Sequence, residues 1–159
     1  MIFVTVGTQD KPFIRLLEAV DKAINEGYIN EEVIVQSGCN KYDSANMKMI
    51  PMLSQQEFEK YINESRIVIT HGGVGSIMTA LKAGKIVIAG ARLERYKEAE
   101  RDHQQEIIDK FAADGNILSL DDFDKLGEVI KRAETFEPKP YVSNTAHLIE
   151  VIEKFIEEH

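Results

Sequence analysis

Short apolar runs alternate with longer stretches of helical period along the chain. Five runs are rich in Ile, Val and Leu and have the length of strands: Ile2–Val6, Glu32–Gln36, Arg66–Thr70, Lys85–Ala89 and Asn116–Leu120. Strands this uniformly apolar are typical of a parallel sheet that is covered on both faces. The pattern therefore predicts an α/β fold with a single doubly wound, Rossmann-like parallel sheet.

The segments between these runs predict helices. Between the first two strands, apolar residues recur at helical spacing from Pro12, which suits a first turn, to Gly27, which suits a helix end. Ser54 and Glu57 form a capping-box pattern that opens the next helix. Further helices are expected over residues 75–83, 102–113, 121–133 and 143–158. No repeat or linker interrupts the pattern, so we expect residues 1–159 to form a single domain.

The last predicted helix, about residues 143–158, has a broad apolar stripe. It consists of Leu148, Ile149, Ile152, Phe155 and Ile156. Two interpretations stay open: the stripe packs back on the chain's own sheet, or it docks to another protein.

Composition limits the classes of function. The chain has 159 residues, a formal net charge of -8 at pH 7, and 19 Lys and Arg that are scattered rather than clustered. This gives no electrostatic reason to bind nucleic acid or an anionic membrane. No apolar run could span a bilayer and the first residues lack a signal-peptide pattern, so we expect a cytoplasmic protein. The single cysteine, Cys39, excludes an internal disulfide and a CxxC metal site.

Three loops that follow predicted strands are rich in small and polar residues. They are Gly7–Gln9, Ser37–Asn40 and His71–Ser76. Ligands of open parallel sheets bind at the carboxyl ends of the strands, so these loops are expected on one edge. Glycines let the backbone approach a ligand closely, and a helix N-terminus favours an anion. The combination predicts a phosphate or diphosphate site; the alternative is that the glycines of the third loop only permit a tight turn.

The best-known phosphate motifs do not match. A dinucleotide-binding fingerprint would need a third glycine where Met78 stands. A Walker loop opens a helix, whereas Gly84 and Lys85 lead into a predicted strand. Residues 122–124 spell DFD, similar to a DxD motif that binds divalent metals in some enzymes. We interpret it instead as the start of a helix, where acidic residues favour the helix dipole.

Other segments occur in a specific order: VTVGTQ, QSG, THGGVGSI, ALKAGKIVI and DHQQEI. Together they resemble the family 28 glycosyltransferase C-terminal domain, over Met1 to about Leu118. The similarity is greatest to the small subunits of two-part enzymes, namely those that extend dolichol-linked GlcNAc and their bacterial counterparts in exopolysaccharide and capsule synthesis.

The resemblance implies a half-enzyme. In this family two Rossmann-like domains face each other in the GT-B arrangement, one holding the nucleotide-sugar and the other the acceptor. It implies that this chain binds a UDP-sugar, and that a membrane-anchored partner subunit binds a polyprenyl-diphosphate-linked saccharide and recruits the chain to the inner face of the membrane. It also implies transfer of a hexose or N-acetylhexosamine with inversion, no cofactor or obligatory metal, and a catalytic base from the partner. A non-catalytic nucleotide-binding or regulatory module stays open as the alternative.

The resemblance further implies which residues bind the donor. They are Gly7, Thr8, Gln9, Ser37, Gly38, His71, Gly72, Gly73, Gly75, Ser76, Thr79, Asp102, His103 and Gln104. The first and third loops would hold the diphosphate, and residues 102–104 would reach the sugar or phosphate. Gln36 would line the nucleotide cleft, and Met52 and Leu53 would lie near the uracil.

Plainer interpretations exist for the polar residues of this set. Ser76 and Asp102 would each cap a helix, Gln104 would lie on a solvated helix face, and His71 would be a buried histidine at a strand end. Each is an alternative to ligand contact.

Thr79 departs from the family pattern, which often has a carboxylate there for the ribose hydroxyls. Threonine offers about one hydrogen bond in its place, and a lost charge-assisted hydrogen bond costs about 1.5 to 3 kcal/mol. We expect either weak donor affinity or a substitute carboxylate such as Glu98.

Overall fold

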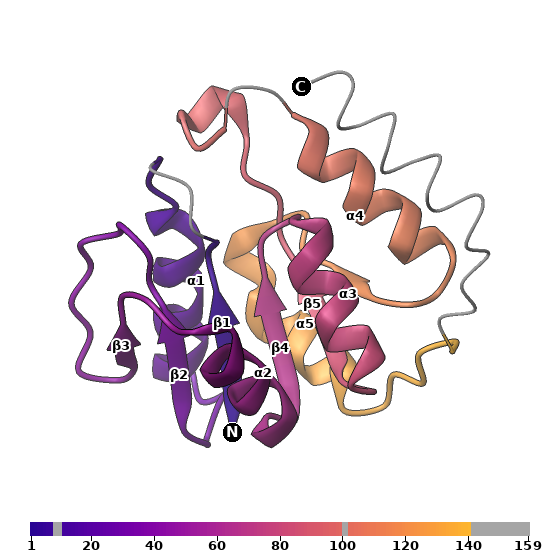
Figure 1. Cartoon of the computed structure of the whole chain (residues 1–159), viewed down its shortest axis with the longest axis horizontal. Helices are drawn as coiled ribbons and strands as arrows, with labels where there is room; N and C mark the ends of the chain where they lie inside the picture. The colour runs from indigo at the N-terminus through magenta and orange to yellow at the C-terminus, as the bar shows by residue number, and fades with distance from the viewer. Residues whose placement is uncertain (8–10, 100–101, 141–159) are drawn as a thin grey trace.

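A six-stranded parallel sheet forms the centre of the protein (Figure 1). The computed structural model describes residues 1–7, 11–99 and 102–140. Its strands are β1 (Ile2–Thr5), β2 (Val33–Gln36), β3 (Lys48–Ile50), β4 (Ile67–Thr70), β5 (Ile86–Ala89) and β6 (Leu118–Ser119). Their order, β3-β2-β1-β4-β5-β6, is that of a Rossmann-like domain, and the direction of winding reverses between β1 and β4.

The register aligns the carboxyl ends of the central strands. Thr5, the last residue of β1, pairs with Gln36 at the end of β2 and with Thr70 at the end of β4. Thr70 in turn pairs with Ala89 at the end of β5. The loops that follow these strands therefore start at one edge of the sheet, as predicted.

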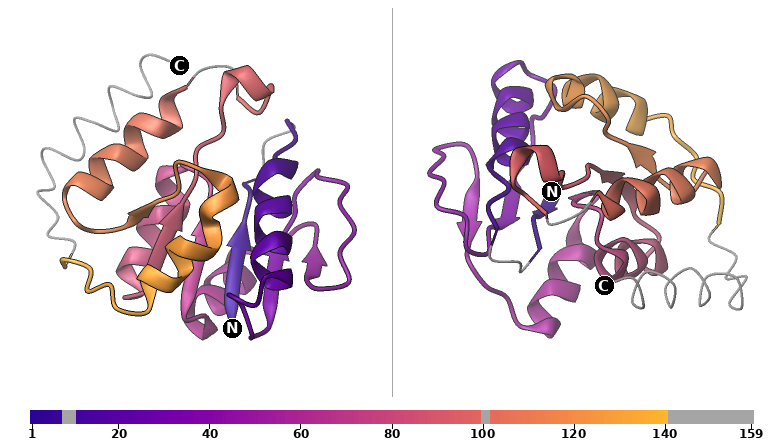
Figure 2. Two further views of the ribbon diagram at one scale, coloured as in Figure 1. Left: turned by 180° about the vertical axis from the view of Figure 1, so that it is seen from behind. Right: turned by 90° about the horizontal axis from the view of Figure 1, so that it is seen from above.

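Helices cover both faces of the sheet. They are α1 (Ile14–Asn25), α2 (Gln55–Glu64), α3 (Val74–Lys82), α4 (His103–Ala113) and α5 (Leu126–Ala133), with short 3-10 helices η1 (Glu94–Tyr96) and η2 (Phe123–Lys125). Figure 2 shows α1 and α5 on one face and α2 and α3 on the other. No helix within the described ranges is long and apolar enough to cross a membrane.

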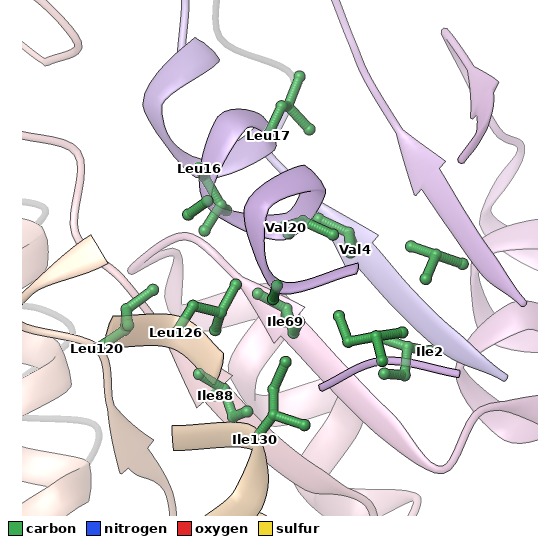
Figure 3. Packing of buried hydrophobic residues seen from close by; sticks show 14 of the residues in the cluster. Ile2, Val4, Leu16, Leu17, Val20, Ile69, Ile88, Leu120, Leu126 and Ile130 are labelled. Atoms are coloured by element: carbon green, nitrogen blue, oxygen red, sulfur yellow. The ribbon is translucent and has the colours of Figure 1, made fainter. Parts of the chain in front are cut away.

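Alternating residues of β1 supply two apolar layers. Ile2 and Val4 face α1 and α5, where they pack in a cluster with Leu16, Ile69, Ile88 and Ile130 (Figure 3). Phe3 points to the opposite face and packs beside the rings of Phe58 and Tyr61 from α2, at centroid distances of 5.6 and 5.8 Å. Burial on both faces explains why the strands are apolar at every position.

The five predicted strands are confirmed, but β3 was not predicted. It has only three residues, pairs only with β2, and begins with the exposed Lys48, so it gives no apolar run. The strand expected at Asn116–Leu120 is shorter, since only Leu118 and Ser119 pair with β5.

The predicted helices are confirmed with one change, and one prediction lies outside the described residues. Gly27, at φ 84°, follows the end of α1, and the capping box of Ser54 and Glu57 opens α2. The helix expected over 121–133 is divided into η2 and α5, and the Asp122 carboxylate caps the start of η2 by accepting a hydrogen bond from the Asp124 amide. The helix expected over 143–158 lies outside the described residues.

Candidate functional site

Three glycine-containing loops pack against each other at the carboxyl edge of the sheet. Gly7 and Gly38 have φ values of 82° and 57°, a backbone region that side chains disfavour. A Cβ atom on Gly38 would lie 2.7 Å from the Gly7 carbonyl oxygen, and one on Gly7 would lie 2.8 Å from Nε2 of His71. The structure therefore brings together the predicted residues Gly7, Gly38 and His71.

The glycines of the β4–α3 loop have different roles. A Cβ atom on Gly73 would lie 2.3 Å from Cε1 of His71, and one on Gly72 would lie 2.5 Å from Cβ of Gln104. Close packing thus explains both glycines without a ligand. Around Gly75, by contrast, no atom lies within 4 Å of a Cβ position. Packing gives no reason for glycine at this exposed residue, which is open to a ligand.

His71 is buried at the end of β4 and is held by Gln104. The Gln104 oxygen accepts hydrogen bonds from the backbone amides of Gly72 and Arg92, both at 3.1 Å. The amide nitrogen consequently faces His71, 3.2 Å from its Nδ1 atom. Because this nitrogen donates, Nδ1 accepts and the neutral ring carries its proton on Nε2.

The ring is neutral at physiological pH. Burial, together with the positive charge of Arg92, lowers the pKa of His71 to about 4. The N–H group on Nε2 lies at the ring edge that faces Gly7 and Gly73. His71 is therefore a buried strand-end histidine that also presents a fixed hydrogen-bond donor between two loops of the site.

The first turn of α3 has no side-chain cap. Its N-cap residue is Gly73, and no acidic residue lies in the first turn. Ser76 lies inside the helix, so its interpretation as a helix cap is wrong. Uncapped amides and the helix dipole at this end favour an anion.

The N-terminus of α4 brings residues 102–104 to the same edge. Asp102 is the N-cap residue of this helix, but its side chain makes no capping hydrogen bond; its carboxylate accepts instead from the Glu94 amide at 2.8 Å. Gln104 is half-buried and does not lie on a solvated face. His103 is the half-buried first residue of α4. Contact of these residues with a sugar or phosphate stays a prediction.

Thr79 and Glu98 are both involved in internal contacts. The Thr79 hydroxyl donates to the Gly75 carbonyl at 2.8 Å. Glu98 is only 4% exposed and accepts from the Arg15 guanidinium through both carboxylate oxygens, at 2.8 and 3.1 Å. It also accepts from the Leu93 amide at 3.1 Å. Both carboxylate oxygens of Glu98 therefore already have partners within the chain, which disfavours Glu98 as a substitute for Thr79.

The remaining predicted residues differ in exposure. Gln36 and Ser37 are buried, and the Gln36 side chain accepts from the Thr5 hydroxyl at 2.8 Å. Met52 is 63% exposed, whereas Leu53 is half-buried against the core. The predicted residues Thr8 and Gln9 lie outside the described residues.

Two residues that sequence reasoning did not single out shape this edge. Arg92 is a fully buried arginine in the β5–α4 loop. Asn40 is buried, accepts from the Phe13 amide and donates to the Ser37 carbonyl at 2.9 Å, joining the loop after β2 to the start of α1. Asn40 lies in the predicted loop Ser37–Asn40, so its loop was visible in the sequence. Arg92 lies in no motif, and nothing in the neighbouring sequence indicates that it is buried.

A hollow beside β6 lies apart from this edge, and the described residues contain no cluster of metal-ligating side chains. Within residues 1–7, 11–99 and 102–140, no three His, Cys, Asp or Glu side chains are grouped as metal ligands. A hollow of about 320 Å³ lies beside β6, and none of the predicted donor-binding residues lines it. Its lining residues are Ser119, Asp121, Asp122, Lys125, Glu128, Val129 and Arg132.

The strand order defines a Rossmann-like domain, and its carboxyl edge is rich in glycine. Residues 1–158 match the glycosyltransferase family 28 C-terminal domain. The chain belongs to this family.

Known relatives agree with this assignment. The chain is 27% identical over 140 residues to the UDP-N-acetylglucosamine transferase subunit ALG13 of Debaryomyces hansenii, covering 82% of this chain and 62% of that protein. An NMR solution structure of ALG13 superposes with a TM-score of 0.61 at 23% identity, covering 94% of this chain and 93% of that one.

The fold also recurs as one half of a larger chain. The crystal structure of MurG from Acinetobacter baumannii superposes with a TM-score of 0.56 at 17% identity. The match covers 96% of this chain and 49% of MurG. The fold is thus the Rossmann-like half of a GT-B glycosyltransferase.

Proposed function

We propose that this protein is the donor-binding subunit of a heteromeric glycosyltransferase. It binds a UDP-sugar, a hexose or N-acetylhexosamine donor, with UDP-N-acetylglucosamine as the first candidate. The family supports glycosyl transfer, and the name of the Debaryomyces relative supports that sugar and a role as a subunit. Because the chain spans 62% of that relative's length, the activity of the whole relative is a proposal for this chain.

One observation carries the proposal: hydrogen-bond donors and open space converge at the carboxyl edge. His71 has an N–H group on Nε2 beside Gly7, α3 begins with uncapped amides, and Gly75 leaves room above that first turn. A diphosphate has only acceptor oxygens and a negative charge. It is therefore complementary to this set of donors and to the helix dipole.

The reaction assigned to the site is an inverting displacement. An acceptor hydroxyl attacks the anomeric carbon from the face opposite UDP, a new glycosidic bond forms, and the bond to the diphosphate breaks. The hydroxyl proton passes to a base, and UDP leaves with the bonding electron pair. Donors of this chain stabilise the charge on the leaving diphosphate, while the base belongs to the partner subunit. We propose that the chain needs no cofactor or metal for this role.

The acceptor half belongs to a separate subunit in this proposal. We assign to it the membrane anchor, the polyprenyl-diphosphate-linked saccharide and the recruitment of this chain to the inner face of the membrane. If the isolated chain transferred sugar to a lipid acceptor at full rate, the division into two subunits would be wrong.

A non-catalytic nucleotide-binding module is the second candidate, and Thr79 favours it. The residue lacks the carboxylate that often holds the ribose, and the carboxylate of Glu98, the expected substitute, is already paired with Arg15. The two candidates differ in a reconstituted reaction, since only a donor subunit makes the partner transfer sugar.

Ligand-observed NMR tests donor binding directly, with UDP, UDP-N-acetylglucosamine, UDP-galactose, UDP-glucose, GDP and NAD as the panel. We expect saturation transfer to the UDP compounds alone. Gly75→Asp places a negative charge in the open space at the start of α3 and is expected to abolish the signal. Lys82→Gln is the matched control, since it changes the charge equally at the exposed far end of the same helix. Equal signals for GDP, or for both variants, would contradict the proposal.

A further inference from the structure

Arg92 has the largest of the fully buried side chains in the described residues. It stands in the β5–α4 loop, immediately after Ala91, and its guanidinium lies 5.0 Å from the centre of the Phe13 ring. An arginine is rarely buried in this way without a carboxylate partner, because the charged group loses its hydration. Hydrogen bonds from the guanidinium to backbone carbonyls replace its lost hydration.

The guanidinium joins two loops of the candidate site. Its Nη1 atom donates to the carbonyl of Lys11 at 2.7 Å and to that of Glu98 at 3.1 Å, and its Nη2 atom donates to the carbonyl of Val6. Val6 and Lys11 lie on the two sides of the connection between β1 and α1. Arg92 therefore ties both ends of that connection to the β5–α4 loop.

The backbone amide of Arg92 and the ring of His71 both contact the side chain of Gln104. The Arg92 amide donates to the Gln104 oxygen that also accepts from Gly72. One side chain and one amide thus connect the ends of β1, β4 and β5 and the start of α4. A change at residue 92 would move these groups together.

The charge of Arg92 is not balanced within the described residues. All the acceptors of its guanidinium are backbone carbonyls, and its Nε atom has no hydrogen-bond partner there. The adjacent carboxylate of Glu98 is already paired with Arg15. The group of Arg15, Glu98 and Arg92 therefore carries one net positive charge beneath the carboxyl edge. Such a charge favours an anionic ligand.

We propose that Arg92 is the positioning residue of the donor site. Its guanidinium holds Val6 and Lys11 against the β5–α4 loop, and its charge, which the described residues do not balance, attracts the diphosphate without touching it. The inference rests on the proposed function, because it names a residue that supports the same site.

The test compares Arg92→Met with Arg66→Met. Methionine has a similar length and is apolar, so it removes the charge and the three hydrogen bonds of Arg92 while it keeps much of the side-chain volume. Arg66 is the matched control, since it is a half-exposed arginine next to the start of β4, at the opposite edge of the sheet, and pairs with Glu31. We expect Arg92→Met to raise the Kd for UDP at least tenfold and Arg66→Met to change it less than twofold. A Kd for Arg92→Met within twofold of the wild type would overturn the proposal.

A ligand-free measurement separates this role from a merely structural one. The positive charge of Arg92 helps to lower the pKa of His71, so an NMR titration is expected to show a higher pKa of that ring in Arg92→Met and none of this rise in Arg66→Met. An unchanged His71 titration would also overturn the proposal. If Arg92→Met does not fold, Arg92→Lys is the deciding variant, because lysine keeps the charge but cannot reach all three carbonyls. A Kd for UDP that rises at least threefold in Arg92→Lys supports the proposal, and an unchanged Kd overturns it.

Failure of the proposed function is distinguishable from failure of this inference. If the wild type binds no UDP compound, donor binding is wrong, and the same variants are titrated with inorganic pyrophosphate. A tenfold weaker affinity of Arg92→Met for pyrophosphate then supports the inference, while equal affinity or no binding by the wild type overturns it.

Discussion

The side-chain nitrogen of Gln104 lies 3.2 Å from Nδ1 of His71. This contact joins the start of α4 to the end of β4, across 33 positions of sequence. Because the oxygen of the same amide accepts from two backbone amides, Gln104 sets both the orientation of the imidazole and the position of its proton. The donor that His71 presents to the site depends on this arrangement.

The stability of the protein is expected to fall as the pH drops from 6.5 to 4. Burial is the main reason that the pKa of His71 is about 4 in the folded state, below its ordinary value of 6.5. As the pH falls, the unfolded chain therefore binds a proton at this histidine before the folded protein does. The contribution of neutral His71 to the free energy of unfolding is complete above pH 6.5 and is lost as the pH falls to 4. At about 1.4 kcal/mol for each pKa unit, the loss is on the order of 3 kcal/mol. Urea unfolding across this pH range measures it.

His71→Gln is the control for that titration, since glutamine does not ionise. Its unfolding free energy is expected to depend less on pH than that of the wild type over the same range. Parallel pH profiles for the two proteins would show that other groups cause the loss.

Removing the Gln104 amide is expected to destabilise the fold. Gln104→Leu leaves the amides of Gly72 and Arg92 without their acceptor, and a buried unsatisfied donor costs about 1 to 3 kcal/mol. Gln105→Leu is the matched control, because the Gln105 side chain makes its hydrogen bond with Asp109 at the surface. Chemical denaturation compares the two, and equal losses would rule out a special role for Gln104.

Two glycines of the site are expected to respond oppositely to alanine. Gly7→Ala introduces a side chain at positive φ and against the His71 ring, so it is expected to destabilise the protein by at least about 1 kcal/mol. Gly75→Ala has free space and gains helix propensity, so it is expected to stabilise the protein by up to about 1 kcal/mol. Thermal unfolding measures both.

Donor binding by Gly75→Ala is expected to weaken despite the gain in stability. The added methyl group lies where a diphosphate would approach the first turn of α3. Titration with UDP checks this, and a variant that is more stable and binds UDP as well as the wild type would place the ligand elsewhere.

Thr79→Glu is expected to tighten UDP binding. A carboxylate accepts from both ribose hydroxyls, and a charge-assisted hydrogen bond contributes about 1.5 to 3 kcal/mol. Thr79→Gln, which adds similar length without the charge, separates the carboxylate from the size of the side chain. An unchanged or weaker affinity of Thr79→Glu would remove Thr79 from the ribose site.

The buried ion pair of Arg15 and Glu98 is expected to matter more than a surface pair. Glu98→Gln leaves Arg15 without its two-point partner, and breaking a pair with one buried member is expected to cost about 2 kcal/mol or more. Glu26→Gln breaks the exposed pair with Lys22, which is worth about 0.5 kcal/mol or less. Urea unfolding of the two variants gives the comparison, and similar losses would contradict the expectation.

Local patterns in the sequence determined much of the fold. Burial on both faces requires apolar residues along the central strands, so β1, β2, β4 and β5 were visible as apolar runs. Caps and glycines at helix ends depend on residues a few positions apart, so the start of α2 and the end of α1 were visible too. The edge strand β3 was not, because a short strand with an exposed lysine has no such pattern.

The site was only partly predictable from the sequence, and there is a physical reason why part of it was not. Glycine-rich loops after strands indicate that the backbone approaches another group closely, but they do not indicate whether that group is a ligand or a side chain of the same protein. Only the tertiary structure decided that Gly72 and Gly73 accommodate Gln104 and His71, while Gly75 stays open. Arg92 and Val6 are 86 positions apart, and Arg15 and Glu98 are 83 apart. Such contacts form because the parallel register brings distant strand ends to one edge, where buried polar groups must find partners that local sequence does not reveal.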